Sequence, residues 1–261
     1  MMKKSKYVVI TGASSGIGYA TAKAFAEREK NLILIARRKE KLLELKNEII
    51  AIHPELDIIV KSIDLSIEKN LYQLFDDLND FEIETWINNA GFGYYSQLAE
   101  QDIQKTVKMI RLNVEALTIL SMLFVEKYQN VTGTQLINVS SAGGYTIVPT
   151  AITYCGTKFF VSSFTEGLAR ELMDTGAKMR AKVLAPAATK TEFGKVANDL
   201  ESYDYDKAFE TYHSSDQMAH FLLDLYDSDK TVGHINRETF TFELSDGLFN
   251  YSDNSSSNQK P

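Results

Sequence analysis

Residues 7–20 read YVVITGASSGIGYA, a β-branched apolar run that passes through a glycine-rich loop into a helix-like pattern beginning near Ile17. Glycine permits the backbone angles of a tight turn and a close approach of the main chain to a bound group. The free N–H groups and the positive dipole end of the following helix favour an anion at that place. We therefore expect the loop to hold the pyrophosphate of a dinucleotide.

The spacing of this loop is G-x-x-x-G-x-G rather than the more familiar G-x-G-x-x-G, so by itself it is a weak signal. The alternative is a tight strand-to-helix turn that binds nothing. Motifs elsewhere in the chain have to decide between the two interpretations.

The bulk composition favours one large α/β domain or two small ones, because 261 residues with 44% hydrophobic content suffice for a sizeable core. The formal net charge of −7 argues against non-specific binding to nucleic acid and against docking on anionic membranes. The single cysteine, Cys155, has no internal disulfide partner and favours a reducing compartment. No run reaches the roughly 20 apolar residues of a spanning helix, and a soluble, cytoplasmic protein is expected.

Strand-like and helix-like segments alternate along the chain, which predicts βαβ units and a parallel sheet. The expected strands are 7–10, 31–36, 57–63, 84–88, 135–139, 179–185 and 239–244. The expected helices are 17–29, 39–52, 67–78, 102–128 and 154–174. Helix 102–128 is apolar on more than one side, which is typical of a helix that is buried or lies partly in a subunit interface. Residues 252–261 are polar, and we expect a disordered tail there.

Two arginines, Arg37 and Arg38, follow the second expected strand. An NAD site would favour an acid here, to accept hydrogen bonds from the ribose 2′-hydroxyl. Arginine instead offers a planar fork of donors that suits a 2′-phosphate, so NADP(H) is favoured over NAD. The alternative is a pair of solvated charges that open a helix.

Polar residues also follow the third and fourth expected strands. The Asp64 carboxylate suits a hydrogen bond from an adenine amino group, and it suits an N-cap of the next helix equally well. The block Asn88–Gly91 (NNAG) offers amide and small side chains that hold neighbouring strands together and let a ribose lie against the backbone. An Asn-Gly-type turn would explain single residues of this block, but not the block as a whole.

Tyr154 and Lys158 stand one helical turn apart, so their side chains share a face. An ammonium group beside the phenol favours the phenolate and is expected to lower the Tyr154 pKa from about 10. That brings a proton donor and acceptor closer to neutral pH, where general acid–base catalysis is most effective. A hydroxyl of Ser140 or Ser141, at the end of the preceding strand, is placed to hydrogen-bond a reacting carbonyl oxygen. Such a Tyr-Lys pair alone is more often surface decoration, but here it follows a dinucleotide loop.

Taken in order, these motifs resemble the short-chain dehydrogenase/reductase family in its compact branch. The resemblance rests on Thr11–Gly18 (TGASSGIG), Asn88–Gly91, the serine strand end and Tyr154-x-x-x-Lys158, and it covers about Lys6 to Gly247. It implies an α/β fold with a Rossmann-type, doubly wound parallel sheet flanked by helices. The implied organisation is a single domain over 1–251, with a lid at about 192–215.

The resemblance also implies a role for each matching residue. Tyr154 would be the catalytic acid/base, and Lys158 would hold the nicotinamide ribose and lower the tyrosine pKa. Ser141, rather than Ser140, stands at the family's usual distance before the tyrosine and would position the carbonyl. Asn113 matches the helix asparagine that holds a water in a proton relay. The implied cofactor-binding residues are Gly12, Ser14, Ser15, Gly16, Ile17, Gly18, Arg37, Arg38, Asp64, Leu65, Asn89, Ala90, Gly91, Tyr154, Lys158, Pro186, Thr189 and Thr191.

By resemblance Arg37 marks the NADP-preferring subgroup, with help from Arg38 and Ser14, because Ser15 is not the basic residue found at the other NADP-associated position. The chain departs from the family after the sixth strand, where Pro-Gly and a branched apolar residue are usual. Here Ala187 replaces the glycine and Thr189 the branched residue, while Pro186 and Thr191 match. The cofactor carboxamide is still expected to meet the Thr189 backbone and the Thr191 hydroxyl.

The implied activity is reversible hydride transfer between NADP(H) and a carbonyl or secondary alcohol. Aromatic residues in the pocket-forming loops suggest an apolar or aromatic substrate, and the alternative is that they pack on one another. These residues are Phe92, Tyr94, Tyr95, Tyr145, Phe193, Tyr203, Tyr205, Phe209 and Tyr212. The four histidines show no ligand-like spacing, so no metal site is expected. The resemblance implies a homodimer or homotetramer.

Two other interpretations stay open at this point. One is an NAD-preferring dehydrogenase of the same family. The other is a non-catalytic, nucleotide-sensing protein on the same fold, against which the intact set of Asn113, Ser141, Tyr154 and Lys158 argues.

Overall fold

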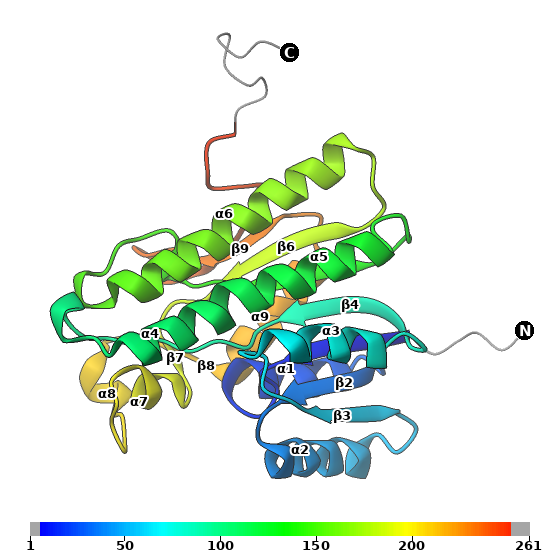
Figure 1. Ribbon diagram of the computed structural model, residues 1–261, viewed down its shortest axis with the longest axis horizontal. Helices are drawn as coiled ribbons and strands as arrows, with labels where there is room; N and C mark the ends of the chain where they lie inside the picture. The colour runs from blue at the N-terminus through cyan, green and yellow to red at the C-terminus, as the bar shows by residue number, and fades with distance from the viewer. Residues whose placement is uncertain (1–5, 252–261) are drawn as a thin grey trace, which may run out of the picture.

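The computed structural model describes residues 6–251 and shows a sheet with helices on both of its faces (Figure 1). Within this range the central sheet has eight strands, in the order β10-β9-β6-β5-β4-β1-β2-β3. The chain runs outward from β1 to β3, crosses back, and continues on the other side from β4. The carboxyl ends of β1 and β4 therefore form a topological switch point, the place where open α/β sheets bind ligands. The expected polar tail, 252–261, lies outside the described residues.

The strands of the central sheet are β1 (Lys6–Thr11), β2 (Asn31–Ala36), β3 (Ile58–Ser62), β4 (Glu82–Asn88), β5 (Gln135–Val139), β6 (Arg180–Ala185), β9 (Val232–Ile235) and β10 (Phe242–Ser245). A separate two-stranded ladder pairs β7 (Thr189–Lys190) with β8 (His213–Ser214). The α-helices are α1 (Gly16–Ala26), α2 (Lys39–Ile52), α3 (Glu68–Asp77), α4 (Ile103–Ile110), α5 (Leu117–Tyr128), α6 (Ile152–Asp174), α7 (Phe193–Ala197), α8 (Tyr205–Ala208) and α9 (Ser215–Asp227). Short 3-10 turns lie at Leu98–Glu100, Ala142–Gly144 and Pro149–Ala151.

The core divides into two layers because the central strands are apolar on both faces. In β2 the side chains of Leu32–Ile35 are fully buried, as expected of a strand that helices cover on both sides. One face packs against α1, α2 and α9 through residues such as Phe25 and Leu222. The other packs against α3, α5 and α6, where Trp86 lies between Phe75 and Phe124. This two-sided burial holds the carboxyl ends of the strands in one fixed row.

The sheet differs from the predicted one at its far edge. Strand β10 pairs antiparallel with β9, so the sheet is mostly rather than wholly parallel, and β10 begins at Phe242 instead of residue 239. Helix α9 and strand β9 were absent from the expected elements. Strand β9 has only four residues and includes Gly233 and His234, which give little strand signal.

The predicted helix 102–128 forms as one run, but its middle is a π-helical segment at Arg111–Ala116, between α4 and α5. The π segment carries the buried side chain of Asn113, which lies below the cavity rather than on the solvent side. Such π segments insert one extra residue into a helix and occur frequently at functional sites. In this segment the polar side chain of Asn113 is buried and bonds the Phe92 carbonyl and the Thr157 hydroxyl.

The last described residues fold back along α6. Glu166 accepts hydrogen bonds from the backbone N–H groups of Leu248 and Phe249, at 2.9 and 3.0 Å. Its other carboxylate oxygen accepts the Tyr145 hydroxyl at 2.6 Å, and the Phe249 ring stacks on Tyr145 with 5.1 Å between ring centres. Because Tyr145 belongs to the loop after β5, one side chain of α6 connects that loop to the end of the described chain.

Candidate active site

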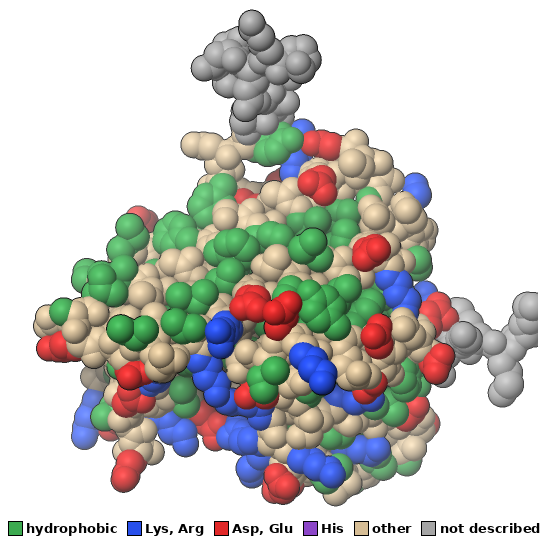
Figure 2. Space-filling model, in the orientation of Figure 1, with side chains coloured by type: hydrophobic (Ala, Val, Ile, Leu, Met, Phe, Trp, Pro, Cys, Tyr) green, Lys and Arg blue, Asp and Glu red, His purple; other side chains and the backbone are tan. Residues whose placement is uncertain are grey.

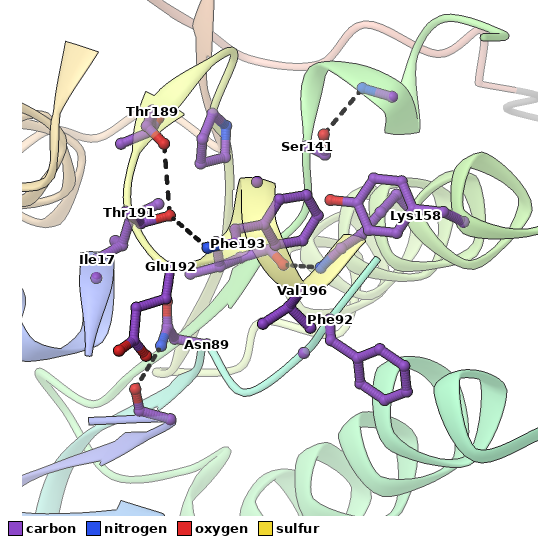
Figure 3. A pocket seen from close by; sticks show the side chains of 18 of the residues that line it. Ile17, Asn89, Phe92, Ser141, Lys158, Thr189, Thr191, Glu192, Phe193 and Val196 are labelled. Atoms are coloured by element: carbon purple, nitrogen blue, oxygen red, sulfur yellow. Dashed lines mark hydrogen bonds between the residues drawn. The ribbon is translucent and has the colours of Figure 1, made fainter. Parts of the chain in front are cut away.

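A cavity of about 730 Å³ opens at the carboxyl ends of the strands, at the switch point between β1 and β4. It collects every residue of the expected cofactor-binding set except Gly18, which lies beneath the loop. Tyr154, Lys158 and Ser141 line the same cavity. Figure 3 shows Ile17, Asn89 and Glu192 on one side of it and Ser141 and Lys158 on the other.

The glycine-rich loop has the tight-turn geometry that its sequence predicted. Gly12 and Gly16 have φ values of +69° and +57°, in a region that glycine adopts readily and residues with a side chain rarely adopt. A Cβ added to Gly18 would clash with the Asn89 side-chain amide and lie 2.6 Å from the Gly12 carbonyl oxygen. Helix α1 begins at Gly16 with no side-chain cap, so its first N–H groups face the cavity without an intrahelical partner. These groups suit an anionic ligand.

The NNAG block ties three strands together. The Asn88 amide donates to Ser121 and to Asn138, at 3.1 and 3.0 Å. The Asn89 amide donates to the Thr11 carbonyl at 2.9 Å, and the Thr11 hydroxyl accepts the Asn89 N–H at 2.9 Å. The block therefore connects the ends of β1, β4 and β5, as expected from its amide side chains.

Asp64 does not cap α3, whose N-cap position is Ile67. Its carboxylate accepts the backbone N–H and the hydroxyl of Ser66, at 2.9 and 2.7 Å. Burial raises the pKa of Asp64, but the Ser66 hydrogen bonds and the charges of Arg37 and Lys108 outweigh burial, so the pKa lies below its ordinary value. The carboxylate is thus ionised at the cavity edge, and the N-cap interpretation is wrong.

The two serines after β5 have different partners and different roles. Ser140 is buried and bonds the Lys158 carbonyl oxygen and the Ser162 hydroxyl, at 3.0 and 2.7 Å. Ser141 accepts the Gly143 N–H at 3.0 Å and lines the cavity with Tyr154. A Cβ added to Gly143 would lie 3.5 Å from the Ser141 hydroxyl oxygen and 3.6 Å from a ring carbon of Tyr154, so the two side chains are close to each other. Ser141 therefore faces the tyrosine, and Ser140 fixes the helix that carries it.

Lys158 of α6 and Asn113 of the π-helical segment are the other two residues of the expected catalytic set. The Lys158 ammonium donates to the Val139 carbonyl at 2.8 Å, and it lies 6.0 Å from the centre of the Tyr154 ring. Asn113 is 1% exposed, donates to the Phe92 carbonyl and to the Thr157 hydroxyl at 2.9 and 3.1 Å, and accepts the Phe92 N–H. It does not line the cavity, although a Cβ added to Gly91, a cavity residue, would lie 3.0 Å from the Asn113 oxygen.

The predicted lowering of the Tyr154 pKa is wrong for this structure. Burial raises that pKa, and the neighbouring Ser141 hydroxyl lowers it by less. Burial lowers the pKa of Lys158 to about 8. The lysine does not offset the burial of the phenol because its ammonium is directed at the Val139 carbonyl rather than at the tyrosine oxygen.

Aromatic side chains cover the tyrosine from the lid side. The Phe193 ring centre lies 5.4 Å from that of Tyr154, and the Tyr95 ring centre lies 5.8 Å from it. Tyr203, Tyr205 and Phe209 pack on one another and also line the cavity. These rings therefore line the cavity and also pack on one another, which are the two arrangements that the sequence left open. Tyr94, Tyr145 and Tyr212 do not line the cavity.

The two arginines after β2 have different partners. Arg38 donates from Nε to the Ser14 hydroxyl at 3.2 Å and from Nη2 to the Ser14 carbonyl at 3.3 Å. The same Nη2 forms a 2.8 Å ion pair with Glu192 of the lid. Arg37 lines the cavity and faces the charge of Asp64. Sequence reasoning missed Glu192, because its partner lies far away in the chain and no local motif marks it.

Residues 6–251 contain no group of three or more His, Cys, Asp and Glu side chains that is arranged to hold a metal ion. No helix in this range has both the length and the apolar character needed to cross a bilayer.

Comparison with known proteins agrees with this geometry. The sequence profile described as short chain dehydrogenase matches residues 6–202. This chain belongs to the short-chain dehydrogenase family. Within the family, an uncharacterized oxidoreductase of Staphylococcus saprophyticus is 30% identical over 83% of this chain and 87% of its own length. Dehydrogenase/reductase SDR family member 11 of Homo sapiens is 30% identical over 80% of this chain and 82% of its own.

Solved structures of family members have the same fold. A short-chain dehydrogenase from Sphingobium yanoikuyae in complex with NADPH superimposes with a TM-score of 0.81, at 27% identity and 89% coverage of both chains. A bulky-bulky ketone specific alcohol dehydrogenase from Comamonas testosteroni gives a TM-score of 0.76, at 27% identity over 89% of this chain and 86% of that one. The chain is thus an oxidoreductase of the short-chain dehydrogenase family with a Rossmann-type domain.

Proposed function

We propose that the protein is an NADP(H)-dependent oxidoreductase that interconverts a carbonyl and a secondary alcohol, with Tyr154 as the general acid/base. The observation that carries this proposal is that Tyr154 and Ser141 lie close together in the cavity that the glycine-rich loop also lines. A pure nucleotide binder has no use for a phenol beside a serine hydroxyl at that place.

The residues present fit a dinucleotide. The positive φ of Gly12 and Gly16 and the lack of room beside Gly18 leave a bare backbone cradle at the start of α1. Arg37, Arg38 and Ser14 supply donors at the end of β2, where a 2′-phosphate would lie. Pro186, Thr189 and Thr191 line the opposite wall and would meet the carboxamide. When bound, the cofactor supplies the hydride.

The chain's own side chains handle the substrate oxygen and the proton. Ser141 donates a hydrogen bond to the carbonyl oxygen and holds it beside Tyr154. In the reduction direction Tyr154 gives its proton to that oxygen, and its raised pKa keeps the proton available at neutral pH. Lys158 holds the nicotinamide ribose, and Asn113 fixes the Phe92 backbone and the Thr157 hydroxyl beside the proton path.

The walls around Tyr154 favour an apolar or aromatic substrate. Phe193, Tyr95 and Tyr203 present ring faces and edges to the cavity, and they offer little to a charged group. We also infer that copies of the chain associate through the exposed apolar side chains of α4, α5 and α6. Cytoplasmic location fits the single buried cysteine, Cys155.

Replacement of the phenol tests the proposal directly. Tyr154→Phe should bind NADPH like the wild type and lose turnover by about 10²- to 10⁴-fold, since only the proton donor is removed. The measurement is NADPH oxidation with a panel of ketones, aldehydes and steroids, beside a fluorescence titration of NADPH. Tyr72→Phe is the matched control and should keep its activity, because Tyr72 is an exposed tyrosine of α3 that does not line the cavity. Near-normal turnover by Tyr154→Phe would refute the acid/base role.

A wild-type protein that binds NADPH tightly and reduces no member of the panel would favour the nucleotide-sensing alternative instead. Stronger binding of NADH than of NADPH would favour the NAD-preferring one. Both outcomes are read in the same two assays, so the three functions are separable.

A further inference from the structure

Glu192 lines the cofactor cavity beside the glycine-rich loop. Its carboxylate lies 2.8 Å from Arg38 Nη2, and Ser15 of the loop lines the same cavity. Figure 3 shows Glu192 on the Ile17 side of the cavity, away from Lys158. The lid therefore reaches the cofactor-binding wall with a negative charge.

Thr191, which directly precedes the lid, packs against the glycine-rich loop. A Cβ added to Gly16 would lie 3.0 Å from the Thr191 side chain, so Thr191 sits directly against the start of α1. The Arg38 guanidinium bonds Ser14 of the glycine-rich loop and pairs with Glu192 of the lid. The guanidinium that suits a 2′-phosphate is thus shared with the lid.

We propose that Glu192 competes with the 2′-phosphate of NADP(H) for Arg38 and thereby sets how strongly the protein discriminates NADP(H) from NAD(H). This inference rests on the proposed cofactor function. A phosphate and a carboxylate use the same guanidinium donors, and two anions on one arginine repel each other. NADH has a hydroxyl at this position, so it leaves the Arg38–Glu192 pair intact.

The exchange is feasible because the pair is not deeply buried. The side chains of Arg38 and Glu192 are 45% and 42% exposed, and an ion pair that is this exposed contributes little stability. A dianionic phosphate therefore displaces the carboxylate at modest cost. Release of Glu192 also breaks the ion pair between the lid and Arg38, so NADP(H) binding and lid position are coupled.

The other edge of the lid provides a control. Asp199, just after α7, forms an ion pair with Lys105 of α4, and the Ala197 carbonyl accepts the Tyr95 N–H at 2.7 Å. Asp199→Asn weakens this attachment without freeing Arg38. Asparagine suits the site because Asp199 has a φ of +54°, a conformation that Asn tolerates.

The experiment measures dissociation constants of NADPH and NADH, by nucleotide fluorescence, for the wild type and four variants. These are Glu192→Gln, Asp199→Asn, Arg38→Ala and the double variant Arg38→Ala/Glu192→Gln. Glu192→Gln should bind NADPH about 3- to 10-fold more tightly and change NADH by less than about twofold. Asp199→Asn should leave the NADPH-to-NADH ratio at its wild-type value. In the Arg38→Ala background the gain from Glu192→Gln should fall below about twofold, because the contested group is gone.

Three outcomes overturn the inference. Equal tightening of both nucleotides by Glu192→Gln would make Glu192 an obstacle to the shared pyrophosphate instead. If Glu192→Gln bound both nucleotides with wild-type affinity, so that the NADPH-to-NADH ratio did not change, Glu192 would have no role in nucleotide selectivity. The proposed function would still stand. A wild type that binds neither nucleotide would overturn the inference together with the proposed function.

Discussion

Tyr154 and Lys158 show how burial sets the charge of the two groups that the sequence placed on one helix face. The phenol pKa is raised and the lysine pKa is lowered to about 8, so both groups favour their neutral forms more than free side chains do. In this arrangement Tyr154 holds a proton at neutral pH, and the lysine charge depends on pH in a range where the enzyme can be assayed.

This shift predicts a pH limit on cofactor binding. The folded pKa of Lys158 lies below its ordinary 10.5, so the ammonium is present below about pH 8 and is lost as the pH rises through that value. NADPH affinity should therefore fall by about 5- to 10-fold between pH 7.5 and 9.5. Titration of NADPH fluorescence across this range is the measurement. Lys158→Arg, which keeps its charge, should remove the fall, and a flat wild-type profile would contradict the role of the ammonium.

The Arg37 guanidinium is expected to favour NADPH over NADH. Arg37→Asp should weaken NADPH more than NADH, by about tenfold or more, because it puts a negative charge beside the 2′-phosphate. The two affinities come from the same titrations. Lys39→Asp, one residue past Arg38 at the start of α2, is the matched control for general charge. Equal losses for both nucleotides would make Arg37 a surface charge.

Single residues were predictable where the signal was local. Gly12, Gly16 and the Tyr154–Lys158 pair were predicted from spacing within a few residues, and Ser141 from its distance to Tyr154 in the family that the chain resembles. The structure gathers them in one cavity. The partners of Arg38 were not predictable, since Glu192 meets it only after the lid folds across the loop. The Tyr154 pKa was predicted with the wrong sign, because the sequence does not reveal how deeply the ring is buried or where the lysine points.

At the scale of elements, apolar runs with polar ends were predicted best. Strands β2 and β5 and helix α2 match the expected ranges residue for residue. Helix α9 was missed although it carries a readable start, a capping box between Ser214 and Gln217. Strand β10 is antiparallel because the chain turns straight back from β9 without a crossover helix, and no sequence period announces that choice.

The packing of α1 on the loop predicts opposite effects for two glycines. Gly18→Ala should lower the free energy of unfolding by about 1–3 kcal/mol, because its Cβ meets Asn89 and the Gly12 carbonyl oxygen. Gly167→Ala in α6 meets nothing within 4 Å and should raise it by about 0.5–1 kcal/mol. Urea denaturation of both variants is the measurement. An equal response would mean that α1 does not press on the NNAG block.

At the scale of the whole molecule, apolar side chains gather on one face. Figure 2 shows them as a band that runs over α4, α5 and α6, which lie side by side in Figure 1. The exposed apolar residues of these helices are Ile103, Val107, Ile110, Met122, Ile152, Phe160 and Met173. A continuous apolar face of this kind favours association with another copy.

This face predicts a change in assembly. Met122 is 62% exposed on α5, and Met122→Lys should shift the protein from oligomer to monomer, because a charge would be buried in the contact. Sedimentation velocity is the measurement. Ile52→Lys at the end of α2, where the side chain is 68% exposed away from this face, should keep the wild-type state. Identical sedimentation of wild type and Met122→Lys would place the contact elsewhere.

The hold of Glu166 on Leu248 and Phe249 gives the end of the described chain an influence on the candidate catalytic loop. A protease that cuts before Leu248 would take away the ring stacked on Tyr145 without entering the cleft. Tyr145 would then keep its hydrogen bonds to Glu166 and to the Ala142 carbonyl, and the loop that bears Ser141 would lose the packing of the Phe249 ring. Cleavage at this point, outside the cavity, would thus lower turnover.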